Sequence, residues 1–163
     1  MRRGLASVLG CVAVLLGGCA TAPEARDFKP MAVRFYLESA SGDGTPVALP
    51  LSGLGVMLNP KPVLTEGDVM DVELVQVDLG RCLLFRLTPA AARDFYRLSV
   101  TQQGRRIVLL LDEAAVGARR IDGPIANGAI FIFVERPEES LPALVENLKK
   151  SSAALQRAIA RKK

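Results

Sequence analysis

The side chain with the clearest chemical role in this sequence is the thiol of Cys19. It follows Leu16, Gly17 and Gly18, and the small glycine residues would let an extended backbone enter a peptidase site. A thiol is a nucleophile that can carry a thioether-linked lipid, and each buried methylene of a lipid contributes about 0.8 kcal/mol to membrane binding. One chain binds weakly and several bind almost permanently. The thiol of Cys19 is therefore a candidate site for lipid attachment.

The residues before Cys19 have the layout of a secretory signal. Two arginines form a charged start, and the apolar run from Leu5 to Leu16 is too short to span a bilayer permanently. Leu16-Gly17-Gly18-Cys19 resembles the bacterial lipobox. This resemblance implies that residues 1–18 are a signal peptide and that the new N-terminus, Cys19, is acylated. A plain secretory signal with a chance cysteine is the alternative.

The sequence after the cysteine indicates where the protein resides. Ala20, rather than aspartate, follows Cys19, which resembles lipoproteins sorted to the outer membrane. Residues 19–30 are small, polar and proline-bearing, and we expect them to form a flexible tether. We also expect no membrane-spanning segment after Cys19. The expected location is the bacterial cell envelope, lipid-anchored at the outer membrane and facing the periplasm.

We predict that Cys19→Ser leaves an unlipidated protein, either soluble or unprocessed, because serine has no thiol to carry the lipid. Metabolic labelling with radioactive palmitate measures this directly. Labelling of the variant at the wild-type level would overturn the lipobox assignment.

The composition excludes many enzyme classes. The sequence has no histidine, which removes Ser-His-Asp and Cys-His catalysis and histidine zinc ligands. It contains no phosphate-binding or dinucleotide-binding glycine motif. Asp112 and Glu113 are adjacent carboxylates, but neighbouring residues on a strand point to opposite faces, so we expect no shared acid–base site. We therefore expect a protein that is not an enzyme and needs no metal or cofactor.

The charge balance argues against nucleic acid as a partner. Arg2 and Arg3 leave with the signal, so 19 of the 21 basic residues remain against 17 acidic residues, a net charge of +2. Of the three cysteines, Cys11 lies in the signal and Cys19 carries the lipid, so no intramolecular disulfide is possible. Cys82 lies in an apolar run and is expected to be a buried structural thiol.

Two groups of basic residues are candidate binding sites. Arg119 and Arg120 lie beside Asp122, where they could form a clamp for a carboxylate or another anion; a solvated turn is the alternative. A second group makes the C-terminus basic and could contact anionic lipid or an acidic partner. The alternative is favourable charge at a helix C-terminus with a solvated tail. This group comprises Lys149, Lys150, Arg157, Arg161, Lys162 and Lys163.

Residues 31–163 are predicted to fold as a single α+β domain, with an antiparallel or mixed sheet and two main helices packed on one face. Alternating or continuous apolar runs predict strands. These are 33–37, 55–58, 69–77, 82–87, 107–111, 114–118 and 129–134. The run 129–134 contains no polar residue, so we expect a central strand there with Phe131 buried.

Local signals predict the helices and turns. Thr65 can cap a brief helical turn, and Gly80 can supply the positive φ of a tight turn after residue 77. Thr88 and Pro89 begin a helix that ends before Gly104. Its expected buried face is Ala92, Phe95, Tyr96 and Ser99. The long amphipathic helix runs from 137 to about 160. Its expected apolar stripe is Leu141, Leu144, Val145, Leu148, Leu155 and Ile159.

Five short sequence motifs, taken in the order in which they occur, resemble those of a known protein module. They are Pro62-Val63-Leu64-Thr65-Glu66-Gly67-Asp68-Val69, Leu87-Thr88-Pro89-Ala90-Ala91-Ala92, Gly104-Arg105-Arg106-Ile107-Val108-Leu109-Leu110-Leu111-Asp112, Gly117-Ala118-Arg119-Arg120-Ile121 and Pro124-Ile125-Ala126-Asn127-Gly128. Together these motifs resemble the head part of the first periplasmic domain of SecD-type protein-export proteins. Arg119 replaces a proline that is common in that family.

The resemblance implies a periplasmic head that contacts a protein or extended polypeptide, without the family's ion-driven membrane helices. We expect a non-enzymatic binding module linked to protein export. A free edge strand or the groove beside a helix would be its binding surface. A fixed structural or assembly subunit of an envelope complex is the alternative.

Overall fold

The computed structural model describes residues 30–161. They form eight strands, two α-helices and two short 3₁₀ helices. The strands are β1 (Val33–Glu38), β2 (Thr45–Ala48), β3 (Gly55–Leu64), β4 (Val69–Val77), β5 (Gly80–Leu87), β6 (Arg106–Leu111), β7 (Ala114–Arg120) and β8 (Ala129–Ile132). The α-helices are α1 (Pro89–Thr101) and α2 (Leu141–Ala160), and the 3₁₀ helices are Glu66–Asp68 and Glu138–Ser140. The predicted α+β class is therefore confirmed.

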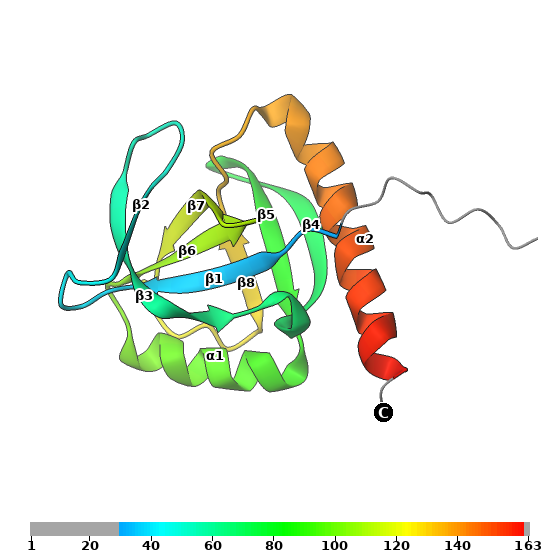
Figure 1. The fold of residues 1–163 in the computed structure, drawn as a ribbon, viewed down its shortest axis with the longest axis horizontal. Coiled ribbons are helices and arrows are strands. Elements are labelled where there is room, and N and C mark those ends of the chain that lie inside the picture. Colours follow the sequence, from blue (N-terminus) through cyan, green and yellow to red (C-terminus); the bar gives the residue numbers. More distant parts are fainter. Residues whose placement is uncertain (1–29, 162–163) are drawn as a thin grey trace, which may run out of the picture.

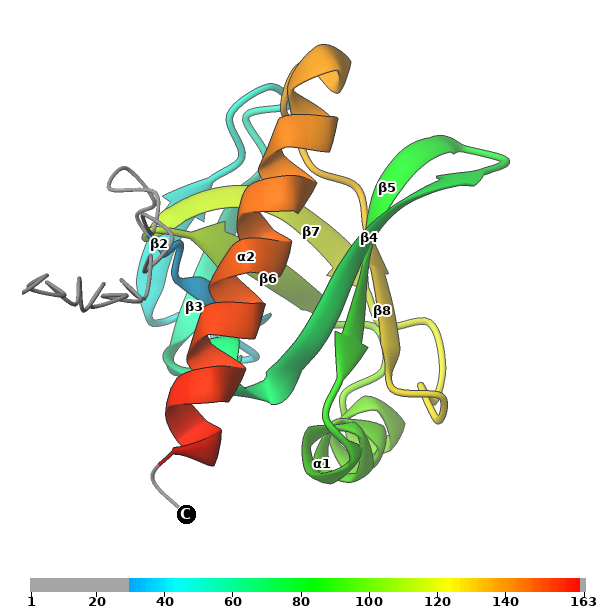
Figure 2. The same ribbon diagram turned by 90° about the vertical axis from the view of Figure 1, so that its right-hand side faces the viewer.

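The strands divide into two antiparallel sheets where the sequence predicted one. The larger sheet has the order β2-β3-β1-β6-β7, and the smaller has the order β4-β5-β8. An isolated bridge between Gly117 of β7 and Val134, just after β8, joins the two sheets. The two helices cover different sides of the molecule instead of one face: α2 lies across β4, and α1 lies along one end of the sheets (Figures 1 and 2).

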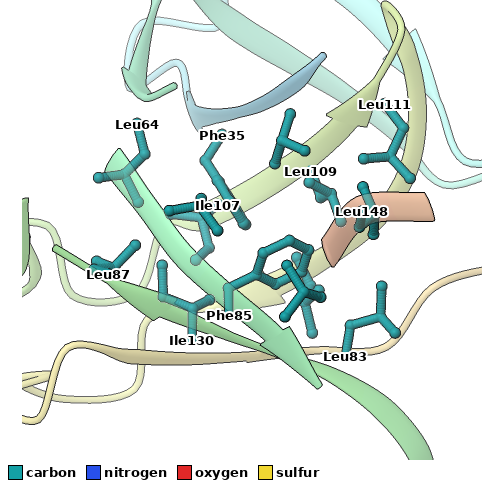
Figure 3. Packing of buried hydrophobic residues seen from close by; sticks show 14 of the residues in the cluster. Phe35, Leu64, Leu83, Phe85, Leu87, Ile107, Leu109, Leu111, Ile130 and Leu148 are labelled. Atoms are coloured by element: carbon teal, nitrogen blue, oxygen red, sulfur yellow. The ribbon is translucent and has the colours of Figure 1, made fainter. Parts of the chain in front are cut away.

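The main core lies between the sheets. On β1, Val33, Phe35 and Leu37 point inward and are buried, and the residues between them are half-buried. Phe35 meets Phe85 of β5 edge-to-face, with ring centroids 5.0 Å apart and planes at 89°, a favoured aromatic geometry. Figure 3 shows the two rings among leucine and isoleucine side chains from both sheets and from α2. The alternation predicted for residues 33–37 is confirmed.

A second, smaller apolar cluster lies on the outer face of the larger sheet. It contains Val108 and Leu110 of β6, which point away from the main core, and three residues of the hairpin formed by β2 and β3. Those three are Leu49, Val56 and Leu58. The β2–β3 hairpin therefore acts as a cover for this face, which the sequence did not predict because residues 45–48 show no strand pattern.

Helix α1 begins and ends as predicted. The side-chain oxygen of Thr88 accepts a hydrogen bond from the backbone N–H of Ala91, and Gly104 beyond the helix has φ +86°. Phe95 and Ser99 are buried as expected. Tyr96, which was predicted to be buried, is 42% exposed, because the residue after Phe95 on the helix points toward solvent. Ala91, which was not predicted to be buried, lies in the core.

Helix α2 is buried along its first half. Leu141, Leu144, Val145 and Leu148 face the core as predicted, and Ser151 and Ser152 continue the buried stripe. The prediction was wrong further along. Ile159 is 37% exposed and Leu155 only half-buried, since α2 extends beyond the sheet that it covers (Figure 2).

Two predicted strands differ from the structure. The predicted strand 55–58 continues to Leu64 through Pro60 and Pro62. Pairing with β2 ends at Leu58, and pairing with β1 is irregular on both sides of the Tyr36–Pro62 pair, so the two prolines lie where the ladder is interrupted. The predicted central strand is β8, which lies at the edge of its sheet and pairs along its length only with β5.

The burial of β8 also differs from the prediction. Ile130 and Ile132 point into the core and are fully buried. Phe131 lies between them, faces the other side and is only half-buried. An unbroken apolar run carries no alternation, so the sequence could not show which residues face the core.

Candidate functional site

Arg119 and Arg120 lie in strand β7 and not in a loop. Arg119 is opposite Ile107 of β6, and Arg120 is opposite Arg106. Consecutive strand residues point to opposite faces, so the two guanidinium groups line different hollows. The structure therefore does not bring them together as one clamp. Arg120 is 65% exposed and its nearest carboxylate, Asp122, is 3.9 Å away.

Arg119 lies next to the free edge of β8. Its Nη1 donates a hydrogen bond of 3.2 Å to the carbonyl oxygen of Phe131. The carbonyl of Gly128 accepts from Leu87 of β5, and antiparallel ladders alternate, so Ile130 and Ile132 bond to β5 while Ala129 and Phe131 face outward. The outward groups of β8 are thus the N–H and C=O of these two residues.

Two side chains partly cover this outward edge. Arg119 bonds the Phe131 carbonyl, and the side-chain oxygen of Asn127 accepts from the backbone N–H of Ala129. Ladder alternation leaves the Phe131 N–H and the Ala129 C=O facing the space beside β8. These two backbone groups belong to the successive peptide units that flank Ile130 and point to the same side of β8, which suits pairing with an extended chain.

The space beside β8 is a shallow hollow of about 350 Å³. Its walls are mainly apolar, with one guanidinium and one side-chain amide. The lining residues are Arg119, Pro124, Ile125, Ala126, Asn127, Ala129 and Phe131. The hollow thus joins an open strand edge to an apolar surface, the combination that binds extended peptides in strand addition.

Helix α1 holds the loop that forms one wall of the hollow. The buried hydroxyl of Ser99 accepts a hydrogen bond of 2.8 Å from the backbone N–H of Ile125. Gly128 has φ +63°, and a Cβ there would lie 2.8 Å from the Cβ of Ala92. Both contacts come from the face of α1 that the sequence predicted to be buried. The wall is therefore preorganised by the fold.

Other sheet edges carry prolines or covering contacts that hinder pairing, including Pro60 and Pro62 in the part of β3 beyond its pairing with β2. Strand β2 is short and contains Pro46, which has no N–H. The 134–135 segment pairs with β7, where Glu135 N donates to the carbonyl of Val116. Helix α2 lies across β4, and Gln156 Nε2 donates to the carbonyl of Val69. The edge of β8 retains outward backbone groups beside a hollow.

A second hollow, of about 480 Å³, lies on the outer face of the larger sheet beside Arg106 and Arg120. Glu135 forms part of it and accepts hydrogen bonds from the backbone N–H groups of Leu51 and Ser52, at 2.7 and 2.9 Å. Desolvation pushes the pKa of Glu135 upward, but the hydrogen bonds from Ser52 and Leu51 outweigh it, so the pKa lies below its ordinary value. This carboxylate fixes the turn of the β2–β3 hairpin.

Asp112 and Glu113 occupy the turn between β6 and β7 and not a strand. Both have positive φ, +47° and +73°, as a two-residue hairpin turn requires. They line one hollow of about 220 Å³ with Arg34 and Tyr36, contrary to the expectation that they face apart. The Asp112 carboxylate accepts a hydrogen bond from the backbone N–H of Ala32 and so anchors the start of β1.

The basic residues of α2 do not form one cluster. Lys149 pairs with Asp71 at 3.8 Å and Lys150 pairs with Glu146 at 2.6 Å, both at exposed positions. Such exposed pairs contribute under about 1 kcal/mol. Arg157 and Arg161 are exposed near the end of the helix. The other two predicted residues, Lys162 and Lys163, lie outside the described residues.

The remaining predictions concern chemistry and membranes. Cys82 is a buried free thiol as expected; burial raises its pKa, and the charge of Arg119 lowers it by a smaller amount. Across residues 30–161, no group of three acidic, cysteine or histidine side chains could hold a metal ion. None of the described helices is long and apolar enough to cross a membrane. Cys19, the signal peptide at 1–18 and nearly all of the tether at 19–30 lie outside the described residues.

Comparison with known proteins identifies the architecture. No protein-family model and no curated protein matches the sequence. Three solved structures of SecDF resemble it over about three quarters of its length. A membrane component SecDF that enhances protein export has 20% identity and a TM-score of 0.58 over 77% of this chain and 64% of that chain.

The other two structures are of longer chains. SecDF in a super-membrane-facing form has 21% identity and a TM-score of 0.59 over 77% of this chain. SecDF from Thermus thermophilus, a translocon-associated membrane protein, has 21% identity and a TM-score of 0.52 over 76%. This chain spans only 19% and 20% of their respective lengths. The described domain therefore has a SecD-like fold, as the five sequence motifs predicted.

Proposed function

We propose that this protein is a non-enzymatic module of the bacterial cell envelope that binds extended polypeptide and is linked to protein export. The observation that carries the proposal is the outward edge of β8 beside the hollow at Arg119. The SecD-like fold supports the link, because the similar structures belong to a component that enhances protein export and is associated with the translocon. The signal and Cys19 lipobox support a lipid-anchored, periplasm-facing location.

The mode of binding is strand addition at β8. An extended chain would donate to the Ala129 carbonyl and accept from the Phe131 N–H, and so extend the smaller sheet by one strand. Main-chain bonds of this kind provide affinity for many sequences, while pockets beside the edge select side chains. The apolar walls of the hollow at Ile125 and Ala126 would contact alternate side chains of the added strand.

A proline on the outward edge of β8 tests this mode. We predict that Phe131→Pro weakens polypeptide binding by about tenfold, since one lost hydrogen bond and the steric block together cost about 1.4 kcal/mol or more. The ladder to β5 stays intact because the Phe131 N–H faces outward. The measurement is fluorescence anisotropy with a labelled, capped nine-residue peptide of alternating valine and serine with a central glutamine.

The matched control is Phe131→Thr, which also removes the ring but keeps the N–H and a strand-favouring side chain. We expect this variant to retain most of the binding. Equal loss in both variants would assign the effect to the ring, and wild-type binding by Phe131→Pro would exclude strand addition at β8.

A fixed assembly subunit is the second candidate, and the exposed apolar residues near the second hollow favour it. Leu51, Leu54 and Phe133 are 72%, 38% and 39% exposed, and the last two line that hollow. Such a patch can mark a permanent interface. A permanent partner would co-purify with the lipidated protein without crosslinking, and Phe133→Ser would release it, whereas transiently bound polypeptide would need crosslinking to be recovered.

A further inference from the structure

Arg119 is one of two half-buried arginines in residues 30–161 without a carboxylate within 4 Å; the other, Arg105, donates to the side chain of Gln102 and to the backbone carbonyl of Glu38 and does not line the β8 hollow. Six arginines lie within 4 Å of a carboxylate: Arg34, Arg81, Arg86, Arg97, Arg106 and Arg120. Within residues 30–161 Arg119 has no such partner. It is half-buried, and its recorded hydrogen bond goes to a neutral carbonyl, that of Phe131.

The position of Arg119 makes its missing counter-ion significant. A guanidinium has five N–H donors in a planar fork that matches a carboxylate. Exposed arginines satisfy these donors with water, whereas Arg119 is half-buried at the wall of a hollow in which five of the seven lining residues are apolar. Its charge acts on its neighbours, since it lowers the pKa of Cys82 against the larger effect of burial. A cation in this setting favours an anionic partner more strongly than a fully hydrated one does.

We propose that the β8 hollow prefers extended polypeptide segments in which an acidic side chain lies among apolar residues, and that Arg119 binds this carboxylate. The inference rests on the proposed function, because the segment is held by strand addition at the same edge. The outward groups of Ala129 and Phe131 would bond a chain that continues past the hollow. The carboxylate is therefore that of an internal glutamate or aspartate and not a chain terminus.

The existing contact of Arg119 suggests how the preference arises. Without a ligand, its guanidinium covers the outward carbonyl of Phe131 and protects the edge from nonspecific pairing. An added strand can supply a backbone N–H to that carbonyl, and the guanidinium then needs another acceptor. A carboxylate on the added strand satisfies it in place, whereas an uncharged segment leaves a partly desolvated cation without a partner.

Two peptides that differ in one functional group test the inference. Both are capped nine-residue peptides of alternating valine and serine; one has a central glutamate and the other a central glutamine. We expect the wild-type protein to bind the glutamate peptide about five- to tenfold more tightly at low salt. The ratio should shrink as salt rises, because ions screen an incompletely buried pair.

Three protein variants complete a double-mutant cycle. Arg119→Gln should bind both peptides with equal affinity, and Arg119→Lys should keep part of the preference because it retains charge without the planar fork. Arg120→Gln is the matched control, since the adjacent residue faces the other side of β7, and it should keep the full ratio. Melting temperatures close to that of the wild type would show that each variant is folded.

The possible failures are distinguishable. Equal affinity of the wild-type protein for the two peptides would overturn the carboxylate preference while leaving strand addition in place. A preference that persists in Arg119→Gln, or disappears in Arg120→Gln, would also overturn the role of Arg119. Absence of binding by both peptides, or binding that Phe131→Pro does not weaken, would refute the proposed function itself.

Discussion

Phe85→Ala is expected to lower the free energy of unfolding by about 3–5 kcal/mol, the range for removing a fully buried phenylalanine ring. Phe85 is 0% exposed at the centre of the smaller sheet, and its ring meets Phe35 of the larger sheet at 5.0 Å. Its removal would leave a cavity between the two sheets that neither backbone can close. Urea unfolding followed by circular dichroism measures the loss.

Phe131→Ala provides the matched comparison because the same atoms are removed from the same kind of residue. Phe131 is half-buried on the outer side of β8, so we expect a loss below about 2 kcal/mol. Equal losses for the two variants would mean that β8 presents Phe131 to the core, in place of Ile130 and Ile132, and would contradict the register of the smaller sheet.

Gly117→Ala is expected to destabilise the protein by about 3 kcal/mol, although it adds only one methyl group. A Cβ at Gly117 would lie 2.3 Å from the carbonyl oxygen of Phe133 and 3.2 Å from the Cα of Val134. Both neighbours are backbone atoms, so β7 and the segment after β8 would have to separate. The Gly117–Val134 bridge that joins the two sheets would then break.

Gly55→Ala is the control for this substitution. Gly55 lies in β3, and a Cβ there meets no atom within 4 Å. We expect its stability to change by less than about 1 kcal/mol, with the sign favouring alanine because the unfolded chain loses freedom. Thermal unfolding of both variants measures the difference. A Gly117→Ala protein as stable as Gly55→Ala would show that the two sheets do not meet at this position.

The sequence was most informative where the determining interactions are local. Thr88 caps α1 with a side-chain hydrogen bond three residues away, and Gly80 with φ +119° closes the turn between β4 and β5. Alternation in β1 identified its buried face because that strand has one side in the core. Each of these signals depends on a few neighbouring residues. The five motifs that resemble those of SecD-type proteins likewise predicted the fold, because they occur in the same order along the chain.

The sequence could not predict the arrangement that long-range pairing decides. The run 129–134 is apolar throughout, so nothing in it distinguishes an edge strand from a central one or Phe131 from Ile130. The predicted strand 55–58 stopped before Pro60 and Pro62, and β3 passes through them where pairing with β2 has ended and pairing with β1 is irregular. The junction between the two sheets depends on the close approach at Gly117, for which the sequence contains no separate sign.

The candidate site shows the same division between local and tertiary information. The sequence alone predicted Arg119 and Arg120 as candidate anion-binding residues, and a free edge strand or the groove beside a helix as the binding surface. Only the tertiary structure separated the two arginines, because strand geometry sends Arg119 toward β8 and Arg120 to the opposite face. It also showed that the edge of β8 lines a hollow, while pairing at the edges of β2, β4 and β7 is hindered by Pro46, Gln156 and the 134–135 segment. The last two are contacts between residues distant in sequence, and such contacts exist only once the chain has folded.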